Sequence, residues 1–369
     1  MEIKKIGIIH IDTEVSWRGG QQQAAYLLEN LYKQGFHTQL ICQPQSEFAK
    51  FCERKEIPFT AIKMHSEIDI WAGFKIAQIC RQQNYRILHL HSAHALSIGI
   101  WAKLFYRKLL LIGVRRVDFH LKNNFSRKYK YNNRWMSRIV CISNGIKKVM
   151  MEDGVDQEKL VTIYSGIDIH KFDDVKRDKQ FRSQNNISEN DIIVGTVAAF
   201  VGHKDYPNLL QAAKLVIEKK SNIRFVALGD GKLEDEMKEL ADKLNISEKF
   251  HFLGFRQNIG SILKNFTIFV MPSKLEGLGT SILDAQSVGL PVIGTNTGGI
   301  PEAVKNDLNG FLVPPENSQE LAKAIIKLSE DENLRQKFAK EAKEYVKKFD
   351  ISTTVKKNIE LYEELICES

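Results

Sequence analysis

Two acidic side chains, Glu276 and Asp284, stand eight positions apart in a stretch suited to a phosphorylated, hydroxyl-rich ligand. The stretch follows an apolar run of strand character, passes through a Gly-x-Gly loop and enters a helical pattern near Thr280. A helix N-terminus offers unpaired N–H groups and partial positive charge, and glycines allow a ligand close to the backbone. We therefore expect a diphosphate site formed by Gly277, Leu278, Gly279, Thr280 and Ser281.

Glu276 is expected on the loop above this site, and Asp284 about one helical turn further on, where it could accept hydrogen bonds from vicinal hydroxyls such as those of a ribose. An ordinary strand–turn–helix with solvated acids is the alternative. A second glycine turn, around Gly299, follows the next strand candidate and favours a site, because ligands of open α/β sheets bind at the carboxyl edge. Lys204 follows another strand and could reach a phosphate as a point charge; a plain surface lysine is its alternative.

In the first half, Gly19 and Gly20 follow the first strand and open the first helix, in a loop that resembles a phosphate loop but lacks GxGxxG. Their backbone could approach a sugar or phosphate. His89, His91 and His94 surround a strand end, and alternation places His89 and His91 on one face. Three histidines suggest zinc, but one strand end gives poor tetrahedral geometry, so a core or hydrogen-bonding role is preferred.

Arg115, Arg116 and His120 follow another strand, where arginines could clamp phosphates. They belong to a basic and aromatic belt across residues 103–148, in which Asp118 stands against many cations. Such a belt suits an anionic membrane surface or single-stranded nucleic acid, and a solvated basic surface is the third possibility. Its cations are Lys103, Arg107, Lys108, Arg115, Arg116, Lys122, Arg127, Lys128, Lys130, Arg134, Arg138, Lys147 and Lys148.

Strand and helix patterns that alternate along the chain must position these residues, and such alternation predicts βαβ units with parallel sheets. The expected strands cover residues 6–11, 38–42, 87–91, 109–114, 138–142, 192–197, 224–228, 250–253, 268–271 and 291–294. A polar stretch at 165–189 separates two similar α/β halves, and residues 318–367 have an almost wholly helical pattern. A cleft between two such halves is the default position for a site.

Composition narrows the class of protein further. The 369 residues suffice for two domains, and the net charge of +8 suggests an anionic partner without choosing one. Five cysteines without a CxxC pair argue against a disulfide framework or zinc site and favour a cytoplasmic location. We find no stretch resembling a signal peptide, and no apolar run near the roughly 20 residues of a membrane helix.

In the order of its motifs along the chain, the sequence resembles retaining glycosyltransferases of family four. These have the GT-B fold, in which two Rossmann-like domains face each other across a cleft. The series runs from the Gly19-Gly20 loop and the His-x-His strand end through Ser165-Gly-Ile-Asp168 to Lys204, Leu228-Gly-Asp-Gly and the acidic pair. The resemblance implies an acceptor-binding domain at 1–168, a nucleotide-sugar-binding domain at 169–350, and a helix at 351–369 that crosses back to the first domain.

The resemblance also implies roles for single residues. Glu276 would contact the donor sugar, Asp284 the ribose and Lys204 the leaving diphosphate, while His91 would hydrogen-bond the sugar. Gly19, Gly20, His203 and residues 277–281 would complete the donor site, and Arg115, Arg116 and His120 would bind the acceptor. Two positions depart from the family pattern: Asp284 replaces a glutamate, and Ala199 lies where an arginine normally helps the lysine.

The activity so implied is retaining, metal-independent transfer from a nucleotide-diphosphate sugar to a glycan or lipid-linked acceptor, with no cofactor. The closest subgroup resemblance is to bacterial enzymes of lipopolysaccharide or cell-surface polysaccharide assembly, in the cytoplasm and in peripheral contact with an anionic membrane. A sugar-nucleotide epimerase of the same fold is the first alternative. A nucleic-acid-binding protein ranks last, because the pattern contains no recognised nucleic-acid module.

Overall fold

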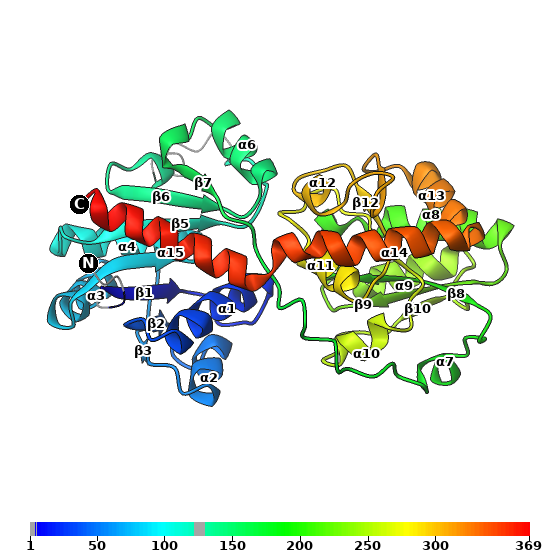
Figure 1. The fold of residues 1–369 in the computed structure, drawn as a ribbon, viewed down its shortest axis with the longest axis horizontal. Coiled ribbons are helices and arrows are strands. Elements are labelled where there is room, and N and C mark those ends of the chain that lie inside the picture. Colours follow the sequence, from blue (N-terminus) through cyan, green and yellow to red (C-terminus); the bar gives the residue numbers. More distant parts are fainter. Residues whose placement is uncertain (1–3, 5, 122–129) are drawn as a thin grey trace. The chain divides into compact units, whose positions relative to one another are not determined.

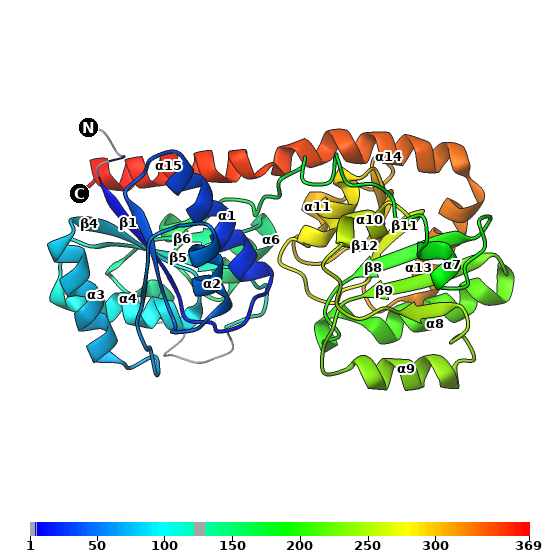
Figure 2. The ribbon, with the colours of Figure 1, turned by 90° about the horizontal axis from the view of Figure 1, so that it is seen from below.

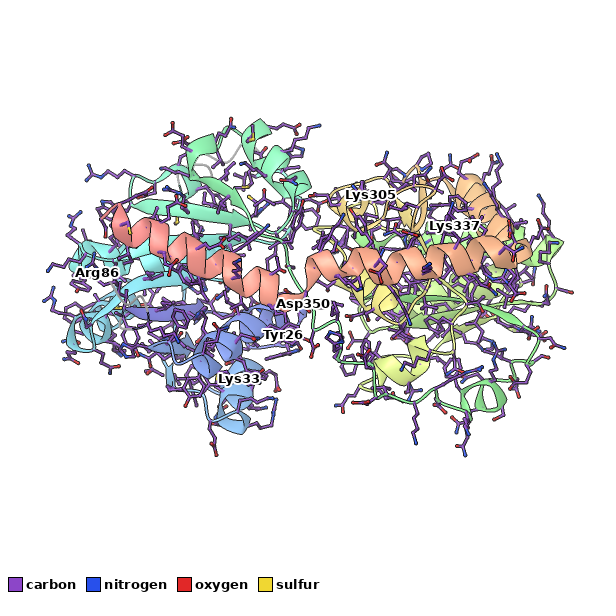
Figure 3. All side chains as sticks on the ribbon, in the orientation of Figure 1. Tyr26, Lys33, Arg86, Lys305, Lys337 and Asp350 are labelled. Carbon is purple, nitrogen blue, oxygen red and sulfur yellow. The ribbon has the colours of Figure 1, made fainter. Side chains whose placement is uncertain are left out.

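The computed structural model describes residues 4, 6–121 and 130–369. The chain divides into two compact units. Unit 1 extends to Gly166 and also contains Ile351–Ser369, and unit 2 is Ile167–Asp350 (Figure 1). The division therefore follows Gly166, whereas the sequence suggested Asp168. Asp350, labelled in Figure 3, ends unit 2, and the last helix begins at the next residue.

Unit 1 is built on a seven-stranded parallel sheet with the order β3-β2-β1-β4-β5-β6-β7. Its strands are β1 (Gly7–Asp12), β2 (Thr38–Cys42), β3 (Phe59–Ala61), β4 (Tyr85–Leu90), β5 (Leu110–Arg115), β6 (Met136–Cys141) and β7 (Leu160–Thr162). Every residue of β1 and β2 is buried, as expected for central strands with helices on both faces.

The helices of unit 1 cover both faces of this sheet. Those with described bounds are α1 (Gly19–Lys33), α2 (Glu47–Arg54), α3 (Ile70–Gln82), α4 (Ala93–Phe105), α6 (Asn144–Glu152), the 3₁₀ turn η2 (Gln157–Lys159) and α15 (Ile351–Cys367). Figure 2 shows α1 and α15 on one face and α3 and α4 on the other. This placement follows from right-handed crossovers, because the strand order reverses direction at β1.

Unit 2 repeats the plan with a six-stranded parallel sheet in the order β10-β9-β8-β11-β12-β13. The strands are β8 (Ile192–Val197), β9 (Ile223–Leu228), β10 (Phe250–Phe252), β11 (Ile268–Met271), β12 (Val292–Thr295) and β13 (Gly310–Val313). In β8, the ring of Phe266 lies so close to Gly195 that an added Cβ would come within 2.0 Å of it, which requires glycine there.

Helices cover both faces of this second sheet as well. They are α7 (Phe181–Gln184), η3 (Gly202–Lys204), α8 (Tyr206–Lys219), α9 (Glu234–Lys243), α10 (Ile259–Leu263), α11 (Thr280–Ser287), α12 (Ile300–Ala303), α13 (Ser318–Glu330), α14 (Glu332–Val346) and η4 (Lys347–Phe349). Helices α8 and α13 pack together over one face around Leu210, Phe225 and Ile325. Helix α11 packs against α14.

The predicted class, two Rossmann-like α/β domains, is confirmed. The ten expected strands form with small shifts at their ends, and the helical tail comprises α13, α14, η4 and α15. Strands β3, β7 and β13 were not predicted; β3 and β7 are only three residues long and are largely not buried, and none of the three shows a clear alternation. Among the described residues, none of the helices is both long and apolar enough to cross a membrane. The five cysteines, all described, are free thiols.

Candidate functional site

The loop of residues 272–279, called the acidic loop here because it carries Glu276, is held in place by the loop that follows β12, the neighbouring strand. The acidic loop joins β11 to α11. Helix α11 begins directly after Gly279, whose φ of 79° favours glycine. The Gly299 N–H donates to the Glu276 carbonyl (2.9 Å), and a Cβ at Gly299 would lie 2.1 Å from the Gly277 oxygen. Thr295 Oγ1 also donates to the Ser273 carbonyl at 2.6 Å. The two glycine turns are therefore packed into one structure at the carboxyl edge.

Lys204 and Glu276 form an ion pair at this edge. Lys204 ends η3, after β8, and its Nζ donates to Glu276 Oε2, which also accepts a hydrogen bond from Ser273 Oγ at 3.3 Å. The Lys204 and Glu276 side chains are only 16% and 12% exposed. The carbonyl of His203 accepts from Lys274 N (2.8 Å), which ties η3 to the acidic loop. A cation and a carboxylate are thus held together at this edge, and each keeps a small part of its side chain exposed.

Asp284 lies one turn into α11 and also has a cationic partner. Lys171 Nζ is 2.6 Å from Asp284 Oδ1, and the two side chains are 23% and 18% exposed. Burial raises the pKa of Asp284, and the charge and hydrogen bond of Lys171 oppose that rise. Sequence reasoning missed Lys171. Its only signal was its position directly before Phe172, in the segment where the chain enters unit 2.

Unit 2 therefore brings together most of the residues predicted for donor binding. The loop and helix start supply Glu276, Gly277, Leu278, Gly279, Thr280 and Ser281, next to Asp284, with His203 and Lys204 from the turn after β8. Ala198 and Ala199 follow β8 where the family pattern has an arginine. The roles of the predicted donor-site residues in binding stay predictions. The chemistry of Lys204 and the start of α11 suits an anion, held beside the carboxylates of Glu276 and Asp284.

In unit 1, Arg116 and His91 come together near Gly20, which with Gly19 forms the start of helix α1 and not a loop. Arg116 Nη2 lies 3.0 Å from His91 Nδ1, and a Cβ at Gly20 would lie 3.4 Å from Arg116 Cδ. Burial lowers the pKa of Arg116 to about 10, an effect that the charge of Asp12 opposes, so the guanidinium is charged at neutral pH. Asp12, which sequence reasoning missed, is buried and accepts hydrogen bonds from Glu14 N and Gln21 Nε2.

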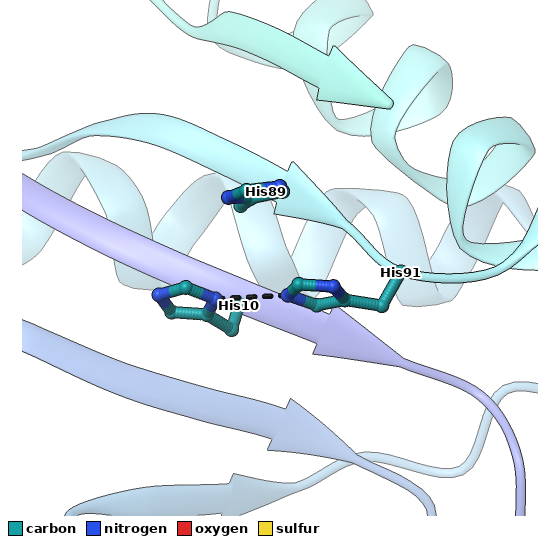
Figure 4. A group of neighbouring side chains, drawn as sticks. All are labelled: His10, His89 and His91. Carbon is teal, nitrogen blue, oxygen red and sulfur yellow. Dashed lines mark hydrogen bonds between the residues drawn. The ribbon is translucent and has the colours of Figure 1, made fainter. Parts of the chain in front are cut away.

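Three buried histidines form a cluster: His10, His89 and His91 (Figure 4). His91 Nε2 lies 2.9 Å from His10 Nδ1, and His89 Nδ1 lies 2.6 Å from the Tyr362 hydroxyl. Burial lowers the pKa of His10 to about 3 and that of His91 well below its usual value, so both rings are neutral. Since a guanidinium only donates, His91 Nδ1 must accept, and His91 Nε2–H donates to His10.

This geometry favours a hydrogen-bonded core over a set of metal ligands. The three ring planes are within 25° of parallel, so their in-plane lone pairs do not converge on one point. The neighbouring Arg116 cation also opposes a metal ion. Sequence reasoning grouped His94 with His89 and His91, whereas the structure groups His10 with them, because β1 and β4 are paired with His10 opposite His89. That metal is not needed stays a prediction.

Arg115 and His120 each contact other residues of unit 1, away from Arg116 and His91. Arg115 Nη2 donates to the Phe119 carbonyl, and its guanidinium lies 5.8 Å from the centre of the Tyr131 ring. His120 Nδ1 lies 2.9 Å from Asp153 Oδ1. The hydrogen bonds of Arg115, Arg116 and His120 thus run to three different places. Arg115 ends β5, Arg116 follows it directly, and His120 lies further along the chain.

The basic belt is not one unpaired surface. Arg138 pairs with Glu364 and Glu368 of α15, Lys130 pairs with Glu67, and Arg107 stacks over Trp135. The acidic partners lie outside residues 103–148, which is why Asp118 was the one acid that the sequence of the belt set against its cations. Several residues of the belt, namely Lys122, Phe125, Arg127, Lys128 and Tyr129, lie outside the described residues.

Two family models match the chain. The model described as glycosyl transferases group 1 matches residues 177–345, and the model described as Glycosyltransferase Family 4 matches residues 17–171. Together they cover most of the chain, so it belongs to this family of glycosyltransferases, as its sequence pattern indicated. It is a transferase that uses a nucleotide-sugar donor. The matches do not favour an epimerase.

The relatives agree with this class. A galactosyltransferase of Escherichia coli, which acts on α-D-GlcNAc-diphosphoundecaprenol with UDP-Gal, is 26% identical over 98% of both chains. An N-acetylgalactosaminyltransferase of Campylobacter jejuni, which acts on N,N'-diacetylbacillosaminyl-diphospho-undecaprenol, is 27% identical over 79% of this chain and 81% of the relative.

Solved structures share the GT-B fold. A glycosyltransferase from Rickettsia africae superposes with a TM-score of 0.87 over 99% of both chains at 21% identity. Anabaena HepE, in complex with UDP and glucose, has a TM-score of 0.85 over 97% of this chain and all of that chain, also at 21% identity.

Proposed function

We propose that the chain transfers a sugar, with retention, from a UDP-sugar to a diphosphate-lipid-linked glycan in the assembly of a cell-surface polysaccharide. The Lys204–Glu276 ion pair beside the start of α11 carries the proposal, because it sets a cation, a carboxylate and helix amides at one sheet edge. The relatives from E. coli and C. jejuni, whose names specify diphosphoundecaprenol acceptors, support the acceptor class.

On donor binding, the diphosphate takes the place of Glu276 as the partner of Lys204. Lys204 and the first amides of α11 then stabilise the charge that develops on the leaving diphosphate. Glu276, released from the ion pair, accepts hydrogen bonds from the donor sugar, and Asp284 accepts them from the ribose. The ion pair is accordingly the resting arrangement of the donor site.

On the acceptor side, Arg116 is the group we propose for the acceptor diphosphate, because it is charged, partly buried and directed by His91. Both ring nitrogens of His91 are engaged, one with Arg116 and one with His10. We therefore propose that His91 positions Arg116. A direct bond from His91 to the donor sugar, as the family resemblance implies, requires one of these two contacts to break.

The test of this function is a thermal-shift panel of nucleoside diphosphates and UDP-sugars, with and without EDTA. UDP at about 100 times its Kd is expected to add about 2.7 kcal/mol to the free energy of unfolding, with no effect of EDTA. One UDP-sugar from the panel is then expected to support transfer to a synthetic polyprenyl-diphosphate sugar. Failure of every nucleotide to stabilise the protein would overturn the proposal.

We further propose that unit 1 contacts the cytoplasmic face of the membrane through the start of α3. Ile68 and Trp71 are 76% and 74% exposed, and Lys75, one turn after Trp71, is also exposed. Exposed aliphatic and indole groups beside a cation suit the interface of an anionic bilayer.

Replacing Trp71 by Ser is expected to lower co-sedimentation with phosphatidylglycerol vesicles by at least threefold at about 0.15 M salt, because the side chain would no longer enter the interface. The matched control is Phe255→Ser, which removes an aromatic side chain of similar exposure, 65%, from unit 2. Equal loss in both variants, or none in Trp71→Ser, would contradict the assignment.

A further inference from the structure

Lys171, which forms an ion pair with Asp284, has no role in the mechanism proposed above, although its partner Asp284 does. The N–O distance of the pair is 2.6 Å, and both side chains are less than one quarter exposed. Most surface ion pairs contribute little, since water screens them and both side chains lose freedom. A largely buried pair differs, because removing one partner leaves an uncompensated charge.

The backbone that carries Lys171 is firmly anchored within unit 2. The Phe172 ring covers Gly260 of α10 so closely that a Cβ there would lie 2.3 Å from the ring. Lys264 Nζ donates to the carbonyls of Phe172 (2.7 Å) and Val175 (2.6 Å). The Lys171 ammonium also lies 4.7 Å from the centre of the Phe172 ring, within the range of a cation–π contact. These contacts fix the point from which Lys171 reaches α11.

The two carboxylate oxygens of Asp284 consequently have different surroundings. Oδ1 faces the lysine, which leaves Oδ2 for hydroxyl donors. Aspartate is also one methylene shorter than the glutamate of the family pattern, so its carboxylate has a shorter reach and fewer rotamers with which to meet the ribose hydroxyls. Burial raises the pKa of Asp284, and a bound diphosphate would add negative charge nearby. A cation at Oδ1 offsets both effects.

We propose that Lys171 is a positioning residue of the donor site, which orients the Asp284 carboxylate toward the ribose hydroxyls and keeps it ionised. This inference rests on the proposed function, since it takes Asp284 to bind the nucleotide. Lys171 itself does not contact the nucleotide. Among the described residues, Lys171 is the charged group that acts on the pKa of Asp284, and α11 itself carries no second charged side chain.

The experiment measures the Kd of UDP by calorimetry between pH 5 and 8 for wild type, Lys171→Met, Lys171→Arg and Asp284→Asn. Lys171→Met is expected to weaken binding about tenfold at pH 7, since charge-assisted hydrogen bonds to the ribose are lost. The ionised carboxylate disappears as pH falls through its pKa, and loss of Lys171 raises that pKa. Binding by Lys171→Met should therefore weaken at a higher pH than binding by wild type, and Lys171→Arg should restore the wild-type profile.

Two further variants separate positioning from other roles. Lys264→Met removes a second lysine that binds the same segment but does not touch Asp284, and it should change the Kd less than twofold. In the Asp284→Asn background, Lys171→Met should have no further effect. A tenfold loss in that background would mean that Lys171 binds UDP directly, and an equal, pH-independent loss in Lys264→Met would mean a merely structural role. Either result overturns the inference.

The inference and the proposed function fail in different ways. If UDP does not bind the wild type, the proposed function is wrong and the inference falls with it. If UDP binds and Asp284→Asn weakens binding, while Lys171→Met does not, only the inference is wrong.

Discussion

Replacing Glu276 by Gln is expected to lower the rate of sugar transfer roughly 10²–10³-fold without weakening the binding of UDP. Gln keeps the shape of the side chain and its contact with Ser273 but removes the negative charge. In the proposed mechanism, that charge holds the donor sugar hydroxyls once Lys204 has turned to the diphosphate. Free UDP has no sugar beyond its diphosphate, so its affinity should stay the same or rise, because Lys204 is no longer held by a carboxylate.

The measurement is initial-rate transfer with saturating acceptor, alongside calorimetry with UDP. Glu316→Gln is the matched control, because Glu316 forms a similar ion pair with Lys274 of the same loop at 2.8 Å. Its transfer rate should stay within twofold of wild type. Wild-type transfer by Glu276→Gln would remove Glu276 from the mechanism.

Replacing Lys204 by Met is expected to weaken UDP binding roughly 10-fold to 100-fold and to lower transfer roughly 10²–10³-fold. The effect is large for two reasons. Lys204 is the cation at the carboxyl end of β8, where Ala199 replaces the arginine of the family pattern. Its loss also removes the cation paired with Glu276, a side chain that is 12% exposed and that faces the diphosphate in the proposed mechanism.

This second reason can be measured separately. The double variant Lys204→Met/Glu276→Gln should bind UDP more tightly than Lys204→Met alone, although it should not recover transfer. Lys274→Met is the control, since it removes a lysine from the same loop that pairs with Glu316 and Asp205. If the double variant binds UDP no better than Lys204→Met, Glu276 does not face the diphosphate in the way we propose.

The sequence was sufficient for the order of elements, because long apolar strands and amphipathic helices carry periodic patterns. The strand β13 was missed although β11 and β12 are equally short, and it forms where its neighbour β12 pairs with it in register. Glycine turns at two strand ends also indicated the position of the site, since all parallel strands of one sheet end at the same edge.

The partners of individual side chains could not be predicted in the same way. Lys171 meets Asp284, and Arg138 meets Glu364, across long sequence separations that only the packing of helices determines. His10 was missed because its role depends on the register between β1 and β4. Periodicity indicates which face a residue occupies, but it does not identify the charge that the opposite element brings to that face.

The packing of Gly299 against Gly277 has a consequence for anyone who would redesign the specificity of this protein. Position 299 in the loop after β12 cannot take a side chain unless the loop after β11 also changes, because that side chain would displace the backbone that carries Glu276. A library built on residues 272–279 should therefore hold residues 294–302 fixed, or vary both loops together as one grafted module.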